Sequence, residues 1–254
     1  MPGWFPGVLT ASVSGLCVKN MFLYYFFITN YQVEKIKKRV IFMEALKEGY
    51  FYHIYNRGAG RNKLFFSEDD YRFFINKYEY YLSPALQTFA WCLLENHFHC
   101  LIRPFNPKEQ VMFYLLNKDK FESAYYHGSQ NPEKKSFNAS KQISHLMNSY
   151  TRYINKKKNR SGTLVEGPFK RIKVLDESNF LNLICYIHRN PIHHKITKNY
   201  SDYPYSSYCD FIKKRKYFIE LEQVIEKFGG IKNFKESHEE FRLKVIPSEK
   251  LLLE

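Results

Sequence analysis

The sequence predicts an α+β domain in which helices pack against an antiparallel sheet. Short segments rich in aromatic and β-branched residues alternate with longer segments whose apolar residues recur at helical spacing. Turn and capping residues separate the two kinds of segment. With 254 residues, the chain is long enough for one such domain with appendages or for two small domains.

The first half of the predicted domain consists of a strand, a helix and two further strands. Residues 50–56 are aromatic and β-branched, which is typical of a strand, and a Gly-rich basic loop follows them. Ser67 is a helix N-cap, and the apolar residues after it keep helical spacing until Pro84. Two strands joined by a tight turn then form a hairpin at residues 87–94 and 97–103.

The second half supplies the remaining helix and strand of the predicted domain. A short helix is predicted over residues 107–116, and Ser140 caps a longer amphipathic helix. Residues 169–174 alternate like a fourth strand, and Asp176 then caps a helix that Pro191 ends. The order β-α-β-β-α-β, followed by a further helix, is that of a ferredoxin-like sandwich with helices on one side of an antiparallel sheet.

Three regions are predicted along the chain. Residues 43–210 form the sheet domain, and residues 211–254 form a C-terminal extension with two helical segments. Residues 1–42 contain a long apolar stretch, but polar residues interrupt it before it could span a bilayer. This segment is interpreted as a membrane anchor, as an extra ordered element, or as a non-native or poorly ordered extension upstream of a start at Met43. We favour the last interpretation.

The charge balance indicates a polyanionic partner. The formal net charge is +14, and the chain holds 21 Tyr and 23 Phe. Basic charge interleaved with aromatic residues favours single-stranded nucleic acid, while an anionic membrane surface or a simple compositional bias are the alternatives. The five cysteines include no C-x-x-C pair, so a disulfide framework and a zinc ribbon are not expected, and a reducing cytosol fits.

Two histidines flank one bulky apolar residue in the third predicted strand. Because side chains alternate along a strand, His97 and His99 point to one face and Phe98 points into the opposite layer. This spacing lets the two imidazoles share one metal ion. Two strand histidines without a metal are the alternative.

Tyr186 and Asn190 lie one turn apart on the helix that begins at Asp176. If that helix packs near the hairpin, the pair His97 and His99 could bind one divalent cation together with Asn190, beside the Tyr186 phenol. A phenol with its ordinary pKa of about 10 is a weak nucleophile at neutral pH, so a cation that polarises a phosphodiester suits it. Imidazole and amide ligands with open positions favour Mg²⁺ or Mn²⁺, and the set suits phosphoryl transfer through a phosphotyrosine.

Five segments of the chain resemble the REP-associated tyrosine transposases, which are single-tyrosine HUH transposases of the IS200 type. They follow the order of that family between about residues 48 and 210, and together they are highly specific. The segments are residues 52–58 (YHIYNRG), 91–102 (WCLLENHFHCLI), 167–171 (GPFKR), 185–191 (CYIHRNP) and 202–208 (DYPYSSY).

The resemblance implies roles for individual residues. In such proteins a His-hydrophobe-His pair binds the metal, and a tyrosine on a nearby helix attacks single-stranded DNA, leaving a 5′-phosphotyrosine and a free 3′-OH. Carried over, His97 and His99 are metal ligands. Tyr186 is the nucleophile, and Asn190 stands at the position of the third ligand. Glu95 replaces the more usual aspartate, which leaves open whether it assists the metal or shapes the turn.

Six basic residues are predicted to contact DNA. They lie in the Gly-rich loop and on the fourth strand, and solvated charge without function is the alternative. His53 either lines the site or is a satisfied sheet histidine. Close to Tyr186 lie His188, His193 and His194, which could hold a second metal, but we expect phosphate contacts or no role. The six basic residues are Arg57, Arg61, Lys63, Lys170, Arg171 and Lys173.

The sequence therefore predicts a metal-dependent endonuclease and strand transferase that acts on single-stranded DNA beside a hairpin. The alternative is a regulatory protein that binds hairpin DNA or RNA without cleaving it. A monomer and a homodimer are both compatible with the sequence, and in a dimer the histidine pair would meet Tyr186 of the other chain. We expect no stable membrane association and a location in the bacterial cytosol, at the nucleoid.

Overall fold

The computed structural model describes residues 45–117, 136–215 and 218–243. The N-terminal extension predicted over residues 1–42 lies outside these ranges. Within them, every helix is too short or too polar to cross a bilayer.

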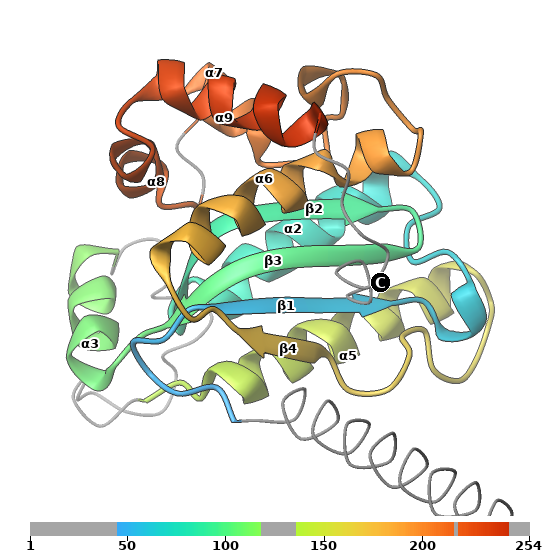
Figure 1. Ribbon diagram of the computed structural model, residues 1–254. Helices are drawn as coiled ribbons and strands as arrows, with labels where there is room; N and C mark the ends of the chain where they lie inside the picture. Colours follow the sequence, from blue (N-terminus) through green and yellow to red (C-terminus); the bar gives the residue numbers. More distant parts are fainter. Residues whose placement is uncertain (1–44, 118–135, 216–217, 244–254) are drawn as a thin grey trace, which may run out of the picture. The chain divides into compact units, whose positions relative to one another are not determined.

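A four-stranded antiparallel sheet forms the centre of the described domain (Figure 1). The strand order is β2-β3-β1-β4, so that β1 and β3 lie in the middle and each strand pairs antiparallel with its neighbours. This order, with helices in the two crossover connections, confirms the predicted ferredoxin-like α+β class. The strands are β1 (Tyr52–Arg57), β2 (Leu86–Leu94), β3 (His97–Pro104) and β4 (Lys170–Lys173).

Helices α2 (Glu68–Leu82) and α5 (Ala139–Lys157) cover one face of the sheet. Strand alternation sends Phe98 of β3 to this face, where its ring centroid lies 5.6 Å from that of Phe74 in α2. Tyr150 of α5 packs edge-on against the same Phe74 ring at 5.1 Å. These aromatic contacts join the two helices to the sheet and form the core of this layer.

Helix α6 (Glu177–His193) covers the other face of the sheet. Its Phe180 packs edge-on against Phe51 and Phe89, with ring centroids 4.9 and 5.4 Å apart. Helices therefore lie on both faces, whereas the sequence predicted them on one. The physical reason is that this second face also carries apolar side chains, which the apolar stripe of α6 removes from water.

Two helix boundaries differ from the predicted ones. The N-cap of α5 is Asn138 rather than Ser140, because the Asn138 side-chain oxygen accepts a hydrogen bond of 3.0 Å from the Lys141 backbone N–H. Helix α6 continues through Pro191 instead of ending there. The predicted caps at Ser67 and Asp176 are confirmed by their hydrogen bonds to the first turn.

The chain after β4 and α6 closes over the edge of β2. The Ser207 N–H donates to the Trp91 carbonyl at 2.9 Å, and the Glu220 N–H donates to the Thr88 carbonyl at 2.9 Å. Edge groups of β2 are thereby satisfied. The remaining helices are α3 (Pro107–Leu116), α7 (Tyr208–Lys213), α8 (Leu221–Lys227) and α9 (Ile231–Leu243), with short 3₁₀ turns η1 (Ala59–Arg61) and η3 (Tyr200–Asp202).

A buried pair of histidines joins α9 to α6. Nδ1 of His238 donates to the Phe234 carbonyl at 2.7 Å, so its Nε2 accepts the Nδ1–H of His188 at 2.8 Å. Nε2 of His188 then accepts the hydroxyl hydrogen of Ser207 at 2.7 Å. Burial lowers the pKa of both imidazoles below the ordinary value for histidine, which agrees with a network that needs both to be neutral.

The free energy of unfolding should fall as the pH drops below about 6.5, the ordinary pKa of histidine. Below that pH the unfolded chain takes up protons at His188 and His238, while burial keeps both neutral in the folded chain. Each group contributes a slope of up to about 1.4 kcal/mol per pH unit. Urea unfolding between pH 8 and pH 5 measures this slope. It should be shallower in His238→Phe, and an unchanged slope would contradict the assignment.

Candidate active site

The histidine pair of β3 lies on the face of the sheet that α6 covers. His97 and His99 share this face, as the alternation predicted. The antiparallel register places Tyr55 of β1 directly opposite His99 and Arg57 directly opposite His97. Residues that are paired in this way point to the same face of a sheet, so β1 lines the same site.

Helix α6 brings Tyr186 to the histidine pair within a single chain. The Tyr186 ring centroid lies 5.8 Å from that of His99 and 6.1 Å from that of His53, and the ring is nearly perpendicular to both. Tyr186 is 9% exposed. The predicted site depends on α6 packing over this face of the sheet, and α6 does so.

Both predicted metal-binding histidines use Nδ1 in a hydrogen bond. Nδ1 of His97 lies 2.7 Å from Oδ1 of Asn96, which can only accept, so the imidazole donates and its Nε2 holds the lone pair. Nδ1 of His99 lies 2.9 Å from Nε2 of His53. Burial, followed by the neighbouring histidines, holds the pKa of His99 well below its ordinary value. A neutral imidazole whose Nδ1–H donates is the form that binds metals through Nε2.

The carboxamide of Asn190 has a fixed orientation. Its Nδ2 donates to the carbonyls of Tyr186 at 3.0 Å and Ile187 at 3.4 Å. The Ile187 carbonyl would normally accept the backbone N–H of residue 191, which is absent because that residue is Pro191. Because its nitrogen is bonded to carbonyls of the helix, the amide directs its oxygen away from them. That oxygen is buried and has no hydrogen-bond partner in the described part of the chain.

Two candidate ligand atoms for a divalent cation lack a partner. Nε2 of His99 and Oδ1 of Asn190 are each buried without a hydrogen-bond partner among the described residues, and coordination to a cation would satisfy such an atom. Two imidazole nitrogens and one amide oxygen leave positions for phosphate oxygens on Mg²⁺ or Mn²⁺. No three His, Cys, Asp or Glu side chains of the described ranges form a metal cluster, so a third protein ligand here would have to be of another kind, such as the Asn190 amide.

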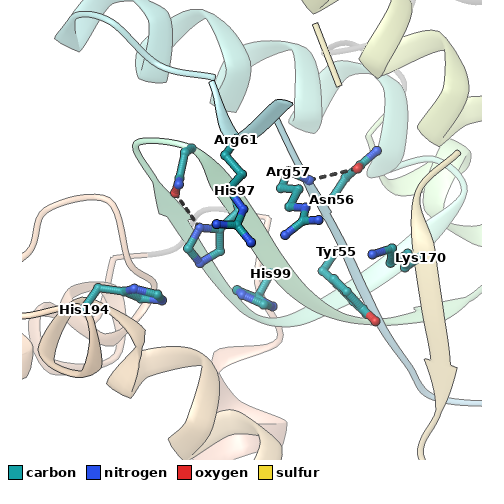
Figure 2. Close-up of a pocket in the computed structure, with 9 residues that line it drawn as sticks. Tyr55, Asn56, Arg57, Arg61, His97, His99, Lys170 and His194 are labelled. Atoms are coloured by element: carbon teal, nitrogen blue, oxygen red, sulfur yellow. Dashed lines mark hydrogen bonds between the residues drawn. The ribbon is translucent and has the colours of Figure 1, made fainter. Parts of the chain in front are cut away.

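A pocket of about 380 Å³ opens beside the histidine pair (Figure 2). Arg61 and Lys170 line it from the loop after β1 and from β4, and Tyr55 lines it between Lys170 and His99. His194, at the end of α6, lines it next to His97, with ring centroids 4.9 Å apart. Its lining residues include no Asp or Glu, so the pocket favours an anionic ligand.

The Gly-rich loop brings Arg57 and Arg61 to this pocket. A Cβ atom at Gly58 would lie 1.9 Å from the Asn62 carbonyl oxygen, so no side chain fits there. Gly60 has a φ of +64°, in the left-handed region that glycine adopts without strain. The two glycines therefore allow the turn that brings Arg61 to the side on which Arg57, at the end of β1, already lies.

Strand alternation separates the three basic residues of β4. Lys170 pairs with Tyr55 and lines the pocket. Arg171 and Lys173 do not line it, and Lys173 instead lies with its ammonium group 3.4 Å above the centroid of the Tyr50 ring. The prediction that all three lie close to the site thus holds for Lys170 alone.

Lys63 and Glu95 form an ion pair outside the pocket lining. Both side chains are 54% exposed, so the pair stabilises little by itself. The Glu95 carbonyl accepts the backbone N–H groups of Leu64 and Phe65 at 2.7 and 3.0 Å. These contacts hold the loop after β1 onto the hairpin turn, which favours a turn-shaping role for Glu95 over a role at the metal.

Tyr55 is a residue of the site that the sequence did not predict. It lies 6% exposed beside His99, and burial raises its pKa to about 12. His53 likewise faces the site, and burial lowers its pKa to about 3. Alternation in the first strand shows that these two residues share a face. Only the register with β3 shows which face that is.

No protein-family model and no curated protein matches this chain. Among solved structures, it is similar to a REP-associated tyrosine transposase bound to a REP hairpin, at 15% identity and a TM-score of 0.48 over 69% of this chain and 87% of that chain. It is also similar to a bacterial tRNA(His) guanylyltransferase (Thg1)-like protein in complex with GTP, at 14% identity and a TM-score of 0.33 over 69% and 79% of the two chains. These likenesses concern the fold and assign no activity.

Proposed function

We propose that this chain is a metal-dependent, single-strand-specific DNA endonuclease and strand transferase of the REP-associated tyrosine transposase type. The observation that carries the proposal is the position of the Tyr186 ring, 5.8 Å from His99. Buried, unpartnered ligand atoms on His99 and Asn190 support a cation at this point. The five sequence segments that resemble the family support the same activity.

Tyr186 supplies the nucleophile in this proposal. Its phenolic oxygen forms a bond to the phosphorus of a phosphodiester, and the bond from phosphorus to the 3′ oxygen breaks. The proton that leaves the phenol is balanced by the one that the 3′ oxygen takes up to become a free 3′-OH. The 5′-phosphotyrosine is still a phosphodiester, with ester bonds to the phenol and to the 5′ oxygen. A 3′-OH can therefore attack it later, release the phenol and rejoin a strand without ATP.

The other residues bind and orient the substrate and the cation. Held by His97, His99 and Asn190, Mg²⁺ or Mn²⁺ would polarise the phosphodiester and neutralise the charge that develops on it. Lys170 and Arg61 provide positive charge for the phosphates of the strand. Arg57 is fixed by a two-point ion pair with Glu166, which orients its guanidinium at the pocket. The proposed substrate, single-stranded DNA beside a hairpin, implies a location at the bacterial nucleoid.

Tyr186→Phe should abolish the covalent protein–DNA adduct and leave DNA binding within about 2-fold of the wild type, because it removes only the nucleophilic oxygen. The adduct is measured as a band that survives denaturing electrophoresis after incubation with hairpin-bearing oligonucleotides and Mn²⁺. Tyr55→Phe is the matched control. It removes the other phenol near His99, so an adduct that still forms on this variant excludes Tyr55 as the nucleophile. An adduct on the Tyr186→Phe protein would refute the proposal.

Asn190→Ala should lower the affinity for Mn²⁺ by at least about 10-fold, because it removes the only oxygen of the three proposed ligands. Asn182→Ala, on the exposed side of the same helix, should bind Mn²⁺ like the wild type. Isothermal titration calorimetry measures both affinities. Equal affinity in Asn190→Ala and the wild type would exclude this residue as a ligand.

Lys170→Ala should weaken the binding of single-stranded DNA about 5-fold and reduce the slope of log affinity against log salt by about 1, as expected for one phosphate contact. Lys173→Ala removes the same charge from the opposite face of the same strand. It should therefore change neither the affinity nor the salt slope. Fluorescence anisotropy at several salt concentrations measures both. Identical effects of the two substitutions would argue for a non-specific contribution of charge.

Binding of hairpin DNA or RNA without cleavage is the second candidate function. One observation favours it, because the basic side chains line the pocket whereas Tyr186 and Asn190 do not. It predicts metal-independent binding and no adduct on any hairpin substrate. The adduct assay therefore separates the two functions.

A further inference from the structure

His53 lies beside three residues of the proposed site, which are Tyr55, His99 and Tyr186. It is 1% exposed on β1. Its ring packs nearly parallel to that of Tyr55, with centroids 4.9 Å apart, and lies side by side with the His99 ring, with centroids 5.1 Å apart. It meets the Tyr186 ring edge-on at 6.1 Å. It is not among the residues that line the pocket, so it does not contact a ligand bound there.

The hydrogen bond between His53 Nε2 and His99 Nδ1, at 2.9 Å, can hold its hydrogen in two ways. In one arrangement His53 donates, and Nε2 of His99 carries a hydrogen that prevents it from binding a cation. In the other, His99 donates from Nδ1, and its Nε2 holds a lone pair. Only the second arrangement makes His99 a ligand.

Nothing else in the described surroundings of His53 selects one arrangement. Nδ1 of His53 has no hydrogen-bond partner among the described residues, and neither has Nε2 of His99. Each arrangement therefore leaves one buried N–H group without an acceptor, so hydrogen bonding within the described residues does not distinguish the two tautomers. His97 differs, because the Asn96 oxygen beside its Nδ1 can only accept.

We propose that His53 is a positioning residue that accepts the Nδ1–H of His99 and so presents the Nε2 lone pair of His99 to the cation. The proposal rests on the metal site of the proposed function and assigns to this site an acceptor from β1. The Tyr55 ring packs nearly parallel to the His53 imidazole, with centroids 4.9 Å apart, and holds it in the plane that this hydrogen bond requires.

Mn²⁺ affinity tests the proposal in three proteins. His53→Phe keeps an aromatic ring of similar size but has no acceptor, so it should lower the affinity for Mn²⁺ by about 10- to 100-fold. His53→Gln places an amide oxygen within reach of the same Nδ1–H and should restore most of that loss. Electron paramagnetic resonance of free and bound Mn²⁺ gives the affinities. Urea unfolding without metal shows that each variant is folded at the start.

His238→Phe is the matched control, because it also removes one member of a buried histidine pair, joined at 2.8 Å. It should leave the Mn²⁺ affinity unchanged. Wild-type affinity in His53→Phe overturns the inference and leaves the proposed function standing. The inference is also overturned if His238→Phe loses as much Mn²⁺ affinity as His53→Phe. It is overturned as well if His53→Gln binds Mn²⁺ as weakly as His53→Phe does. A wild-type protein that binds no Mn²⁺ overturns the proposed metal site and this inference with it.

Discussion

The two-residue alternation of side chains along β3 is the constraint on which the rest of the structure depends. It buries Phe98 in the layer under α2 and α5 and turns His97 and His99 to the face under α6. A register shift of one residue would exchange the two sets, placing imidazoles in an apolar layer and an aromatic ring at the pocket. The pairing of β1 with β3 then determines which side chains surround the histidines.

Packing and chemistry in this site have the same origin. The contacts of Phe180 with Phe51 and Phe89 hold α6 against the sheet. The packing of α6 on this face also removes the imidazoles of His53 and His99 from water. Burial is what lowers the pKa of His53 and of His99, because a charged ring is poorly solvated there. An apolar contact some distance from the histidines thus keeps them in the neutral state that can accept a cation.

Local patterns predicted most of the elements, because alternation, helical spacing and caps such as Ser67 and Asp176 depend on neighbouring residues alone. Other features depend on contacts between residues that are far apart in the sequence. The bond between His53 and His99 joins positions 46 residues apart, and no local signal shows it. One failure had a local signal, because alternation alone places Arg171 and Lys173 on the opposite face of the strand from Lys170. Which of them reaches the pocket follows only from the register with β1.

The pair Asn190 and Pro191 shows how a missing backbone donor inside a helix can determine the direction of a side chain. The proline leaves the Ile187 carbonyl without its backbone donor, and the asparagine amide takes over that bond. Replacing the proline would return a backbone donor to the carbonyl and leave the amide held by the Tyr186 carbonyl alone. Replacing the asparagine would leave the carbonyl unsatisfied. The two positions thus constrain each other and should vary together in evolution, as a single two-residue unit.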